Sequence, residues 1–465
     1  MQNRRKPSPN RRAEQNGDDV ASARPLRVLH LITRLDRGGS AENTLLTVIG
    51  LARRGYAVAL ASGNSAESRM TPGEISSLKA RLAEAREAGA QVIVLPSLRR
   101  QISPLRDLAA LIGLIRLIRR FSPDIVHTHT SKAGALGRLA AWVCRAPVVI
   151  HTPHGHIFYG YYGPWITAAI VAVERGLGRL THGLITLTDV GKQDYLDRRI
   201  IAADRLHAIP SGIDLTAFRN GPGRFPKPPA YAVGGGVDWN RRVHSAETKA
   251  RRMIGLPSQG PVIGVVGRLV PIKGHRYLID ALPAILHEFP KARLLFVGEG
   301  DERARLARQA AQLGVADHLH LVGAQPELRR YFAACDLIVQ PSLNEGMGRT
   351  VVEALVMGKP VVASRVGGLP ELIHQGRNGL LVPPASPAAL AEAVCSLLRD
   401  QVRLRRMGEA ARRSVTSRYT TMAMVDAIDR LYRWLAYRRS AANTAPAKAV
   451  APSRARPHSR IPKRD

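Results

Sequence analysis

Two glutamates flank the start of a predicted helix in the segment 344–353, NEGMGRTVVE. Glu345 lies in a loop after an apolar run, and Glu353 lies about one turn into the helix. A carboxylate can accept two hydroxyl donors at once. The free N–H groups of a helix start, here those of Gly348 to Val351, bind an anion. The segment suits a ligand with two separate diols and an anionic centre between them. The alternative is a loop glutamate and another on a solvated helix face.

Two cations, Arg268 and Lys273, lie in the segment 267–274, GRLVPIKG, between a buried strand and a helix. Both side chains should emerge at the carboxyl edge of the sheet. A diphosphate in a cleft needs compensating donors, which Arg supplies as a bidentate fork and Lys as a point charge. Because the chain has 69 Lys and Arg residues, two solvated loop cations remain the alternative.

Two adjacent glycines, Gly38 and Gly39, follow the first predicted strand in the segment 36–42, DRGGSAE. They allow the backbone to approach a phosphate or a sugar closely, and Ser40 suits the N-cap of the next helix. The segment is not GxGxxG, and no GxxxxGK[ST] occurs in the chain. A tight strand–helix turn explains the glycines about as well as a ligand does.

Histidines gather after two further predicted strands, in 127–134 (HTHTSKAG) and 151–160 (HTPHGHIFYG). His154 lies two residues past the end of its strand, so we expect it to reach the cleft edge of the sheet. Five histidines suggest a metal site, but they lack a defined ligand spacing and have few nearby carboxylates. We therefore expect no metal, and we expect some of these histidines to bond to the backbone of strand-end turns.

A basic amphipathic segment covers 104–120, PLRDLAALIGLIRLIRR. Leu and Ile recur at helical spacing, and Arg106, Arg116, Arg119 and Arg120 occupy other positions. Such a helix can lie on anionic lipid. The alternative is an ordinary sheet-covering helix with solvated arginines, and one helix can do both.

The elements that position these residues are short apolar strands that alternate with helices. Continuous apolar runs are typical of parallel strands buried on both faces. The strands predicted in the first half are 26–32, 56–61, 91–95, 124–128, 147–152, 183–188 and 205–209. Those predicted in the second half are 261–267, 293–298, 318–322, 336–340, 360–364 and 379–382.

So many strands exceed one compact sheet of ordinary size. We predict an α/β protein with two Rossmann-like, doubly wound domains that face across a cleft, with ligands at the carboxyl ends of the strands. A stretch at 219–248, rich in Pro and Gly, separates the two series. The predicted boundaries are a disordered basic tail at 1–25, domains at 26–218 and 258–416, a linker or insertion at 219–257, a helix at 417–437, and a second disordered basic tail at 438–465.

The chain has 465 residues and a formal net charge of +33, which suits nucleic acid, a membrane surface or a phosphorylated ligand. Its ordinary hydrophobic content excludes wholesale disorder. The three cysteines, Cys144, Cys335 and Cys395, are far apart, which excludes a disulfide scaffold and fits a reducing cytoplasm. We find no signal peptide and no run long enough to cross a bilayer. We expect a cytoplasmic protein that is soluble or peripheral on the membrane.

Residues 26–437 resemble the glycosyltransferases of family 4, which have the GT-B fold. The resemblance depends on Glu345 and Glu353 as an E-x7-E motif, on Arg268 and Lys273 as R-x4-K, and on VGGLPEL at 366–372. It implies a nucleotide-sugar-binding second domain, an acceptor-binding first domain, and a helix at 418–437 that crosses back to the first domain.

The resemblance also implies roles for the site residues. Arg268 and Lys273 would grip the diphosphate of the donor, Glu353 would hold the ribose hydroxyls, and Glu345 would contact the sugar. The further residues implied are the active-site histidine His154, the glycines Gly38 and Gly39 facing the diphosphate and acceptor, and the backbone amides of Met347, Gly348, Arg349 and Thr350. Members of this family often have an aromatic residue where this chain has Met347.

The function implied is transfer of a hexose-type sugar from a UDP- or GDP-sugar to a hydroxyl of a glycan or lipid-linked acceptor, in surface polysaccharide or glycolipid synthesis. Many members retain the anomeric configuration and need no tightly bound metal. A nucleotide-sugar epimerase of the same fold is one alternative. A basic nucleic-acid-binding protein is another, although the sequence has no helix-turn-helix, zinc finger or RNA-binding aromatic motif.

Overall fold

The computed structural model describes residues 24–36, 38–65, 70–155, 158–159, 162–220 and 247–444. Most of the predicted basic tail at 1–25, the Pro- and Gly-rich stretch and the last residues of the chain lie outside this range, and so does His156. Arg24 is described, and its guanidinium forms an ion pair with Asp124 at 2.7 Å.

The first half of the chain forms a sheet of seven strands in the order β3-β2-β1-β4-β5-β6-β7. All neighbouring strands are parallel. The order reverses between β1 and β4, which makes a topological switch point where ligands bind in such sheets. The strands are β1 (Arg27–Ile32), β2 (Ala57–Ser62), β3 (Gln91–Val94), β4 (Ile125–His129), β5 (Val148–Thr152), β6 (Gly183–Thr186) and β7 (Leu206–Ala208).

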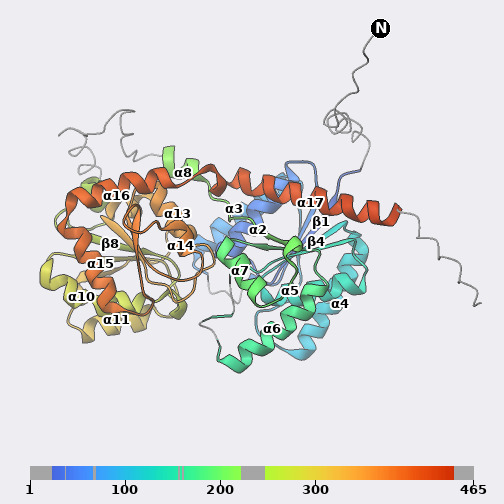
Figure 1. The fold of residues 1–465 in the computed structure, drawn as a ribbon, viewed down its shortest axis with the longest axis horizontal. Coiled ribbons are helices and arrows are strands. Elements are labelled where there is room, and N and C mark those ends of the chain that lie inside the picture. The colour runs from blue at the N-terminus through green and yellow to red at the C-terminus, as the bar shows by residue number, and fades with distance from the viewer. Residues whose placement is uncertain are drawn as a thin grey trace, which may run out of the picture.

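Helices cover both faces of this sheet (Figure 1). The helix over the predicted basic segment turns Ala110, Leu114, Ile118 and Phe121 inward, a spacing of three or four residues that places them on one face. It is therefore a sheet-covering helix. The helices are α2 (Gly39–Ala52), α3 (Pro72–Glu87), α4 (Pro104–Phe121), α5 (Ser131–Val143), α6 (Pro164–Arg179) and α7 (Asp189–Asp197), with a 3₁₀ turn η3 (Ala203–Arg205). The next helix, α8 (Leu215–Asn220), packs instead on α13 (Arg349–Val356) of the second half.

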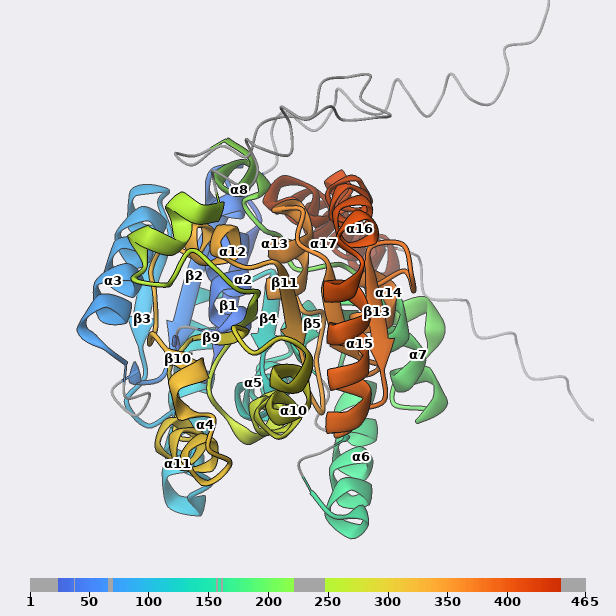
Figure 2. The same ribbon diagram turned by 90° about the vertical axis from the view of Figure 1, so that its left-hand side faces the viewer.

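The second half forms a six-stranded parallel sheet in the order β10-β9-β8-β11-β12-β13. Its strands are β8 (Val262–Val266), β9 (Arg293–Val297), β10 (Leu319–Leu321), β11 (Leu337–Gln340), β12 (Val361–Ser364) and β13 (Gly379–Val382). The helices are α10 (His275–Glu288), α11 (Arg303–Gln312), α12 (Arg329–Ala334), α13 (Arg349–Val356), α14 (Leu369–Leu372), α15 (Pro387–Arg399) and α16 (Gln401–Ser414), with 3₁₀ turns η4 (Pro271–Lys273) and η5 (Ala316–His318). The predicted class of two doubly wound α/β domains is confirmed (Figure 2).

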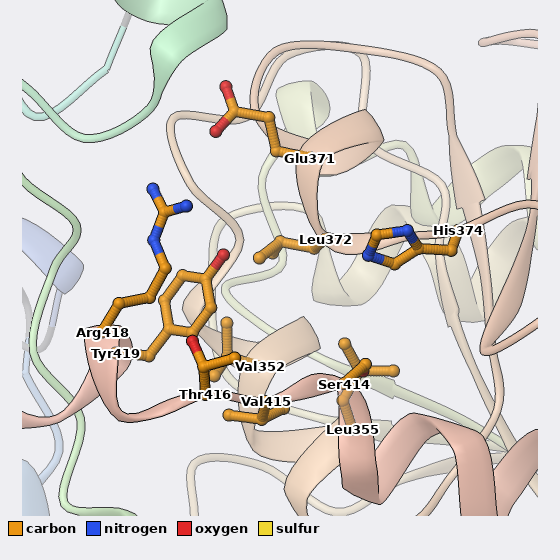
Figure 3. A pocket seen from close by; sticks show the side chains of 10 residues that line it. All are labelled: Val352, Leu355, Glu371, Leu372, His374, Ser414, Val415, Thr416, Arg418 and Tyr419. Carbon is orange, nitrogen blue, oxygen red and sulfur yellow. The ribbon is translucent and has the colours of Figure 1, made fainter.

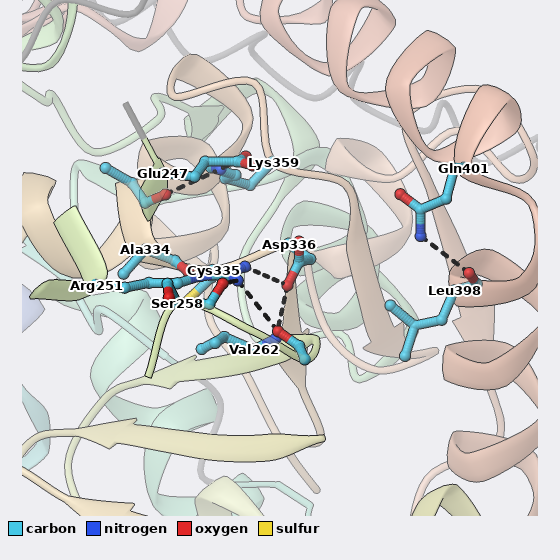
Figure 4. Close-up of polar contacts among 12 residues, drawn as sticks. Glu247, Arg251, Ser258, Val262, Ala334, Cys335, Asp336, Lys359, Leu398 and Gln401 are labelled. Carbon is cyan, nitrogen blue, oxygen red and sulfur yellow. Dashed lines mark hydrogen bonds and ion pairs between the residues drawn. The ribbon is translucent and has the colours of Figure 1, made fainter. Parts of the chain in front are cut away.

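The prediction of a linker as far as residue 257 is wrong at its C-terminal end. Residues 247–253 are helical, and Arg251 ties them to the second sheet (Figure 4). Its guanidinium donates to the carbonyl of Ala334 at 2.9 Å and to Asp336 Oδ2 at 2.7 Å. Asp336 also accepts from the N–H of Val262 at the start of β8, at 2.6 Å. A buried arginine with these partners is part of the domain core, which no local periodicity revealed.

The chain crosses between the domains twice, and the two crossings lie side by side. The N–H of Ile213 donates to the carbonyl of Tyr419 at 2.8 Å, and Ile213 forms a parallel bridge with Thr420. After η6 (Ser417–Tyr419), α17 (Thr421–Thr444) runs back across the first domain and packs on α2 (Figure 1).

The second tail was predicted to be disordered from residue 438, but the helix continues to Thr444. Arg and Ala in 438–444 favour helix, and the first proline comes only at position 446.

Candidate functional site

The Lys273 ammonium and the Glu345 carboxylate meet at the carboxyl edge of the second sheet, with 2.5 Å between Nζ and Oε2. The same carboxylate oxygen lies 3.2 Å from both Gln340 Nε2 and Ser342 Oγ. Arg268 is exposed directly after β8. The two motifs that the sequence placed 72 residues apart therefore share one edge of the sheet.

Gly274 allows the loop before Lys273 to approach the loop of Glu345. It adopts φ +67°, and a Cβ there would lie 2.0 Å from the carbonyl oxygen of Pro341. The N–H of Leu343 completes the loop pairing by donating to the carbonyl of Ile272 at 2.8 Å. Only glycine fits this position, because a side chain would meet both the steric clash and the strain of a left-handed backbone.

The start of α13 lies beside this ion pair. Gly348 is its N-cap at φ +86°, and a Cβ there would lie 2.7 Å from Leu369 Cδ2. The N–H of Val351 already donates to the Gly348 carbonyl at 3.0 Å. It was predicted to be a free anion donor, and that detail is wrong because the first turn closes on the N-cap. Glu353 is buried one turn along the helix, and Thr350 Oγ1 donates to Gln340 Oε1 at 3.3 Å.

Arg349 joins the two domains. Its guanidinium donates to Ser211 Oγ at 2.8 Å and to the carbonyl of Gly212 at 2.5 Å. A Cβ on Gly39 would lie 3.3 Å from Arg349 Cδ, so the glycine pair of the first domain faces the start of α13. The Met347 side chain is buried, and its Sδ lies 3.2 Å from the backbone nitrogen of Ser211.

His154 reaches the same place from the first domain. It adopts φ +63°, and its carbonyl oxygen would lie 2.8 Å from a Cβ on Gly346, next to Glu345. Burial, with a further contribution from the nearby Arg349 guanidinium, lowers the pKa of His154 to about 3. The imidazole is therefore neutral at physiological pH.

The other histidines bond mainly to side chains, and the expectation that some of them bond to the backbone is met by one. His129 Nδ1 lies 2.9 Å from His154 Nε2, and His127 lies 2.5 Å from the Tyr432 hydroxyl and 2.8 Å from Thr152 Oγ1. The exception is His151, whose Nδ1 lies 3.1 Å from the Thr128 carbonyl. Parallel register brings these rings together, because the strand ends align across the sheet.

His30 in β1 adds a further ring to this group. The ligand atoms of His30, His127 and His129 lie within 4.8 Å of one another, a spacing that could hold a metal ion. The group includes no carboxylate. Both ring nitrogens of His127 and of His129 already have hydrogen-bond partners. Hydrogen bonding therefore accounts for two of the three rings, whereas His30 Nε2 has no partner among the described residues.

Several residues at the domain boundary were missed from the sequence. Ser211 and Gly212 follow β7, and their position after a strand end was an available signal. The Asn344 amide donates to the carbonyl of Tyr159 at 2.9 Å, and the N–H of Val190 donates to Glu371 at 2.6 Å. These pairs connect segments about 180 residues apart in sequence, and no local pattern signals them.

A pocket of about 200 Å³ lies at the second crossing between the domains (Figure 3). Its lining includes Glu371, His374, Arg418 and Tyr419, and none of the predicted site residues. It is therefore distinct from the cluster around Lys273 and Glu345.

Comparison with known families gives two matches that cover the two domains in turn. Residues 38–212 match the glycosyl transferase 4-like domain, and residues 246–414 match the glycosyl transferases group 1.

Curated relatives match over both domains. The UDP-Gal:alpha-D-GlcNAc-diphosphoundecaprenol alpha-1,3-galactosyltransferase of Escherichia coli is 28% identical over 340 residues, which cover 72% of this chain and 82% of that protein. The D-inositol 3-phosphate glycosyltransferase of Corynebacterium glutamicum is 30% identical over 314 residues, which cover 64% of this chain and 70% of that protein.

Solved structures share the fold. Anabaena HepE in complex with UDP and glucose superposes with a TM-score of 0.68 at 21% identity, over 88% of this chain and 99% of that one. WaaG, a glycosyltransferase involved in lipopolysaccharide biosynthesis, superposes with a TM-score of 0.64 at 18% identity, over 87% of this chain and 99% of that one.

Proposed function

The chain belongs to the family-4 type of group 1 glycosyltransferases with the GT-B fold, and from that premise we propose that it moves a sugar from a UDP- or GDP-sugar to a hydroxyl of a lipid-linked acceptor. The observation that carries the proposal is the meeting of Lys273, Glu345 and the start of α13 at one sheet edge, opposite Gly39 and His154 of the first domain.

Each part of this edge has a chemical counterpart in a nucleotide sugar. The diphosphate takes the cations Arg268 and Lys273 together with the N–H groups at the start of α13. Glu353 accepts the ribose hydroxyls, and Glu345 accepts the hydroxyls of the sugar. In the ligand-free protein the Glu345 carboxylate holds the Lys273 ammonium, so the cation is positioned before the diphosphate arrives.

Charge builds on the diphosphate as its bond to sugar C1 breaks. Cations and helix N–H groups that are already in place stabilise this charge more in the transition state than in the ground state. The acceptor oxygen reaches C1 from the side of Gly38 and Gly39. Closure of the first domain against the start of α13 keeps out water that otherwise hydrolyses the donor.

We expect retention of the anomeric configuration, which NMR of the product tests.

The residues at this edge suit a reaction without a bound metal, because Arg268, Lys273 and the helix start already supply positive charge to the diphosphate. Activity should therefore survive EDTA treatment. A rate that falls with the chelator and returns with added Mg²⁺ or Mn²⁺ contradicts this part of the proposal.

Exposed apolar side chains on two helices that flank α5 in the first domain support an acceptor held at a membrane. We define the α4–α6 face by its exposed side chains Ile102, Leu105, Leu108, Trp165 and Ile166. Trp165 is 88% exposed and Leu105 is 82% exposed. Helix α5 contacts both α4 and α6, and Figure 1 shows the three helices together on one side of the domain. The exposed stripe of α4 continues into Arg116, Arg119 and Arg120.

Apolar side chains beside a group of arginines fit the surface of an anionic bilayer. Helix α6 is the first helix after His154 along the chain, and we propose that a membrane at this face presents a lipid-linked hydroxyl to the site. Among the described residues no helix is both long and apolar enough to cross a bilayer, and the contact we propose is peripheral.

Nucleotide binding by the full chain tests the donor half of the proposal. UDP or GDP at about a hundredfold excess over its dissociation constant should stabilise the fold by roughly 2.7 kcal/mol. An unchanged melting temperature with both nucleotides contradicts the proposal. An oligonucleotide that stabilises the protein while both nucleotides fail favours the nucleic-acid alternative.

A further inference from the structure

Three histidine rings form a chain of hydrogen bonds that ends at the site. His30 Nδ1 lies 2.9 Å from His129 Nε2, and His129 Nδ1 lies 2.9 Å from His154 Nε2. The rings are stacked, with centroids 5.2 Å apart in the first pair and 5.1 Å in the second. The chain begins in the middle of β1, passes the end of β4 and reaches the loop after β5.

The inner part of this chain is buried in the core of the first domain, with His127 as a polar neighbour. Parallel register pairs His30 with His127 and Ile32 with His129, so these side chains share the sheet face that α2 and α17 cover. His30 is 0% exposed and His129 is 1% exposed. Polar rings in such a place cost free energy unless they are hydrogen-bonded. Leucine or valine would fill this space without that cost, so packing alone does not explain the histidines.

The hydrogen bonds along a row of neutral imidazoles must all run in the same direction. Burial lowers the pKa of His30, His129 and His154 far enough that all three are uncharged at physiological pH. A neutral imidazole has one N–H and one lone pair, so each ring must donate to the next in one direction. Only two arrangements exist, and they place opposite tautomers on His154.

The two ends of the chain distinguish these arrangements. His30 Nε2 and His154 Nδ1 are buried atoms with no hydrogen-bond partner among the described residues. One of them must carry an N–H and the other a lone pair. A buried N–H without a partner is rarer in proteins than an acceptor without one. His30 is enclosed in the core, whereas the backbone of His154 borders Gly346 and its imidazole lies near the Arg349 guanidinium. We therefore place the oxygen that accepts this bond, an oxygen of the ligand, at His154. The N–H therefore belongs at His154.

Resting on the function proposed above, we propose that His30 and His129 are positioning residues that hold His154 as its Nδ1–H tautomer, a hydrogen-bond donor to an oxygen of the bound nucleotide sugar. In this arrangement His30 donates from Nδ1 to His129, and His129 donates from Nδ1 to His154 Nε2. His154 then contributes a fixed donor and does not act as a base, because its only lone pair is occupied by His129.

The most direct test is the tautomer of His154 in the ligand-free full chain. Long-range ¹H–¹⁵N NMR of ¹⁵N-histidine-labelled protein, with His154→Gln to assign the signal, distinguishes the two tautomers by their nitrogen shifts. We expect Nδ1 to carry the proton. A protonated Nε2 on His154 overturns the proposal. The readout needs no substrate, so it stands even if the proposed transfer activity is not found.

A matched pair of variants at His30 tests its positioning role. The Asn amide in His30→Asn can place a donor where Nδ1 lies, whereas His30→Leu has a similar size and no donor. We expect His30→Leu to lower kcat for transfer about tenfold, to leave UDP affinity unchanged, and to show a mixed His154 tautomer. His30→Asn should restore the wild-type tautomer and most of the rate. If both variants keep the tautomer and the rate, the proposal is wrong.

A metal in the cluster is the competing explanation. Because the ligand atoms of His30, His127 and His129 lie within 4.8 Å of one another, elemental analysis of the purified full chain belongs in the same experiment. We expect less than a tenth of an equivalent of any transition metal, as an order-of-magnitude bound for an unfilled site. Stoichiometric zinc or copper that survives dialysis overturns the hydrogen-bond chain, because the metal takes the lone pairs that the chain requires.

Discussion

The ion pair between Lys273 and Glu345 is the feature of the site that a diphosphate must disturb. The Lys273 side chain is 20% exposed and that of Glu345 is 12% exposed, so removing one partner leaves the other poorly hydrated. A charged hydrogen bond of this kind contributes about 1.5–3 kcal/mol. The pair therefore both stabilises the loop and holds a cation ready for the ligand.

Lys273→Ala should lower kcat/KM at least about a hundredfold, because about 2.7 kcal/mol of stabilisation of the leaving group is lost. It should also abolish most of the stabilisation by UDP or GDP. Steady-state kinetics and thermal unfolding measure these effects. Lys291→Ala is the matched control, since Lys291 is an exposed lysine of the same domain that bonds only to Gln259 among the described residues. An equal loss in both variants contradicts the role of Lys273.

The residues of the second-domain edge could be predicted because sequence carries them in two short motifs. Lys273 and Glu345 follow strands that are neighbours in a doubly wound sheet, so they had to meet. His30 could not be connected to His154 in this way. The link requires the register of β1 against β4 and the course of the loop after β5, and neither follows from spacing along the chain.

At the scale of elements, the site depends on turns that only certain residues can make. Gly274 ends η4 and brings Lys273 to Glu345. Gly314, just after α11, has a nearly identical φ of +69°, but a Cβ there would meet nothing within 4 Å. Alanine at Gly314 would introduce backbone strain alone, whereas alanine at Gly274 would introduce the same strain and a steric clash.

Gly314→Ala should cost about 1–2 kcal/mol of stability, the strain of a left-handed alanine, and leave activity unchanged. Gly274→Ala should cost more and should also weaken UDP binding, because the new Cβ pushes the Pro341 loop away from Lys273. Chemical denaturation and nucleotide titration measure the two effects. If Gly274→Ala binds UDP as the wild type does, the loop does not position the cation.

The buried histidines of β1 and β4 make the free energy of unfolding depend on pH. Burial lowers the pKa of His30 to about 3, and it lowers that of His127 and His129 as well. The unfolded chain, with histidine pKa near 6.5, therefore binds more protons as the pH falls. Stability is complete above about pH 6.5 and is lost progressively toward pH 3, with about 2 kcal/mol of the loss at pH 5 from His30 alone.

Urea denaturation at pH 7.5 and pH 5.5 measures this dependence. His30→Leu should show a smaller fall than the wild type, by about 1.4 kcal/mol over this interval, because one such histidine is gone. A free energy of unfolding that does not change between the two pH values contradicts the burial of neutral histidines.

At the scale of the whole molecule, alternation of strands and helices was enough to predict two doubly wound domains. The contacts between the domains were not predictable in the same way. The contact of Arg349 with Ser211 depends on the relative position of the two domains, which the bridge between Ile213 and Thr420 fixes. The prediction that the chain is disordered from residue 438 was also wrong, because a solvated helix and a disordered tail can have the same basic composition.

We expect the whole molecule to bind a membrane through the α4–α6 face. Trp165→Ser combined with Leu105→Ser should weaken binding to vesicles of anionic phospholipid about tenfold or more, because two apolar side chains no longer leave water. Val402→Ser, at an exposed valine of α16 in the other domain, is the control and should bind as the wild type does. Replacing Arg116, Arg119 and Arg120 with Gln should weaken binding most at low salt.

Vesicle flotation measures these affinities. Equal binding by wild type, the double serine variant and the triple glutamine variant removes the support for a peripheral membrane contact. Catalytic transfer to a water-soluble acceptor should change little in the double serine variant, which separates membrane binding from chemistry.

The central claim, transfer of a sugar from a nucleotide sugar, is tested most directly by a panel of UDP- and GDP-sugars incubated with the full chain and a lipid-linked acceptor. Release of nucleoside diphosphate and sugar on the acceptor are measured together. We expect at least one donor to release diphosphate only when the acceptor is present, with one sugar transferred per diphosphate, and we expect Lys273→Ala to lose this activity. A donor that is converted to another nucleotide sugar without diphosphate release, or a panel in which no sugar reaches any acceptor, contradicts the central claim.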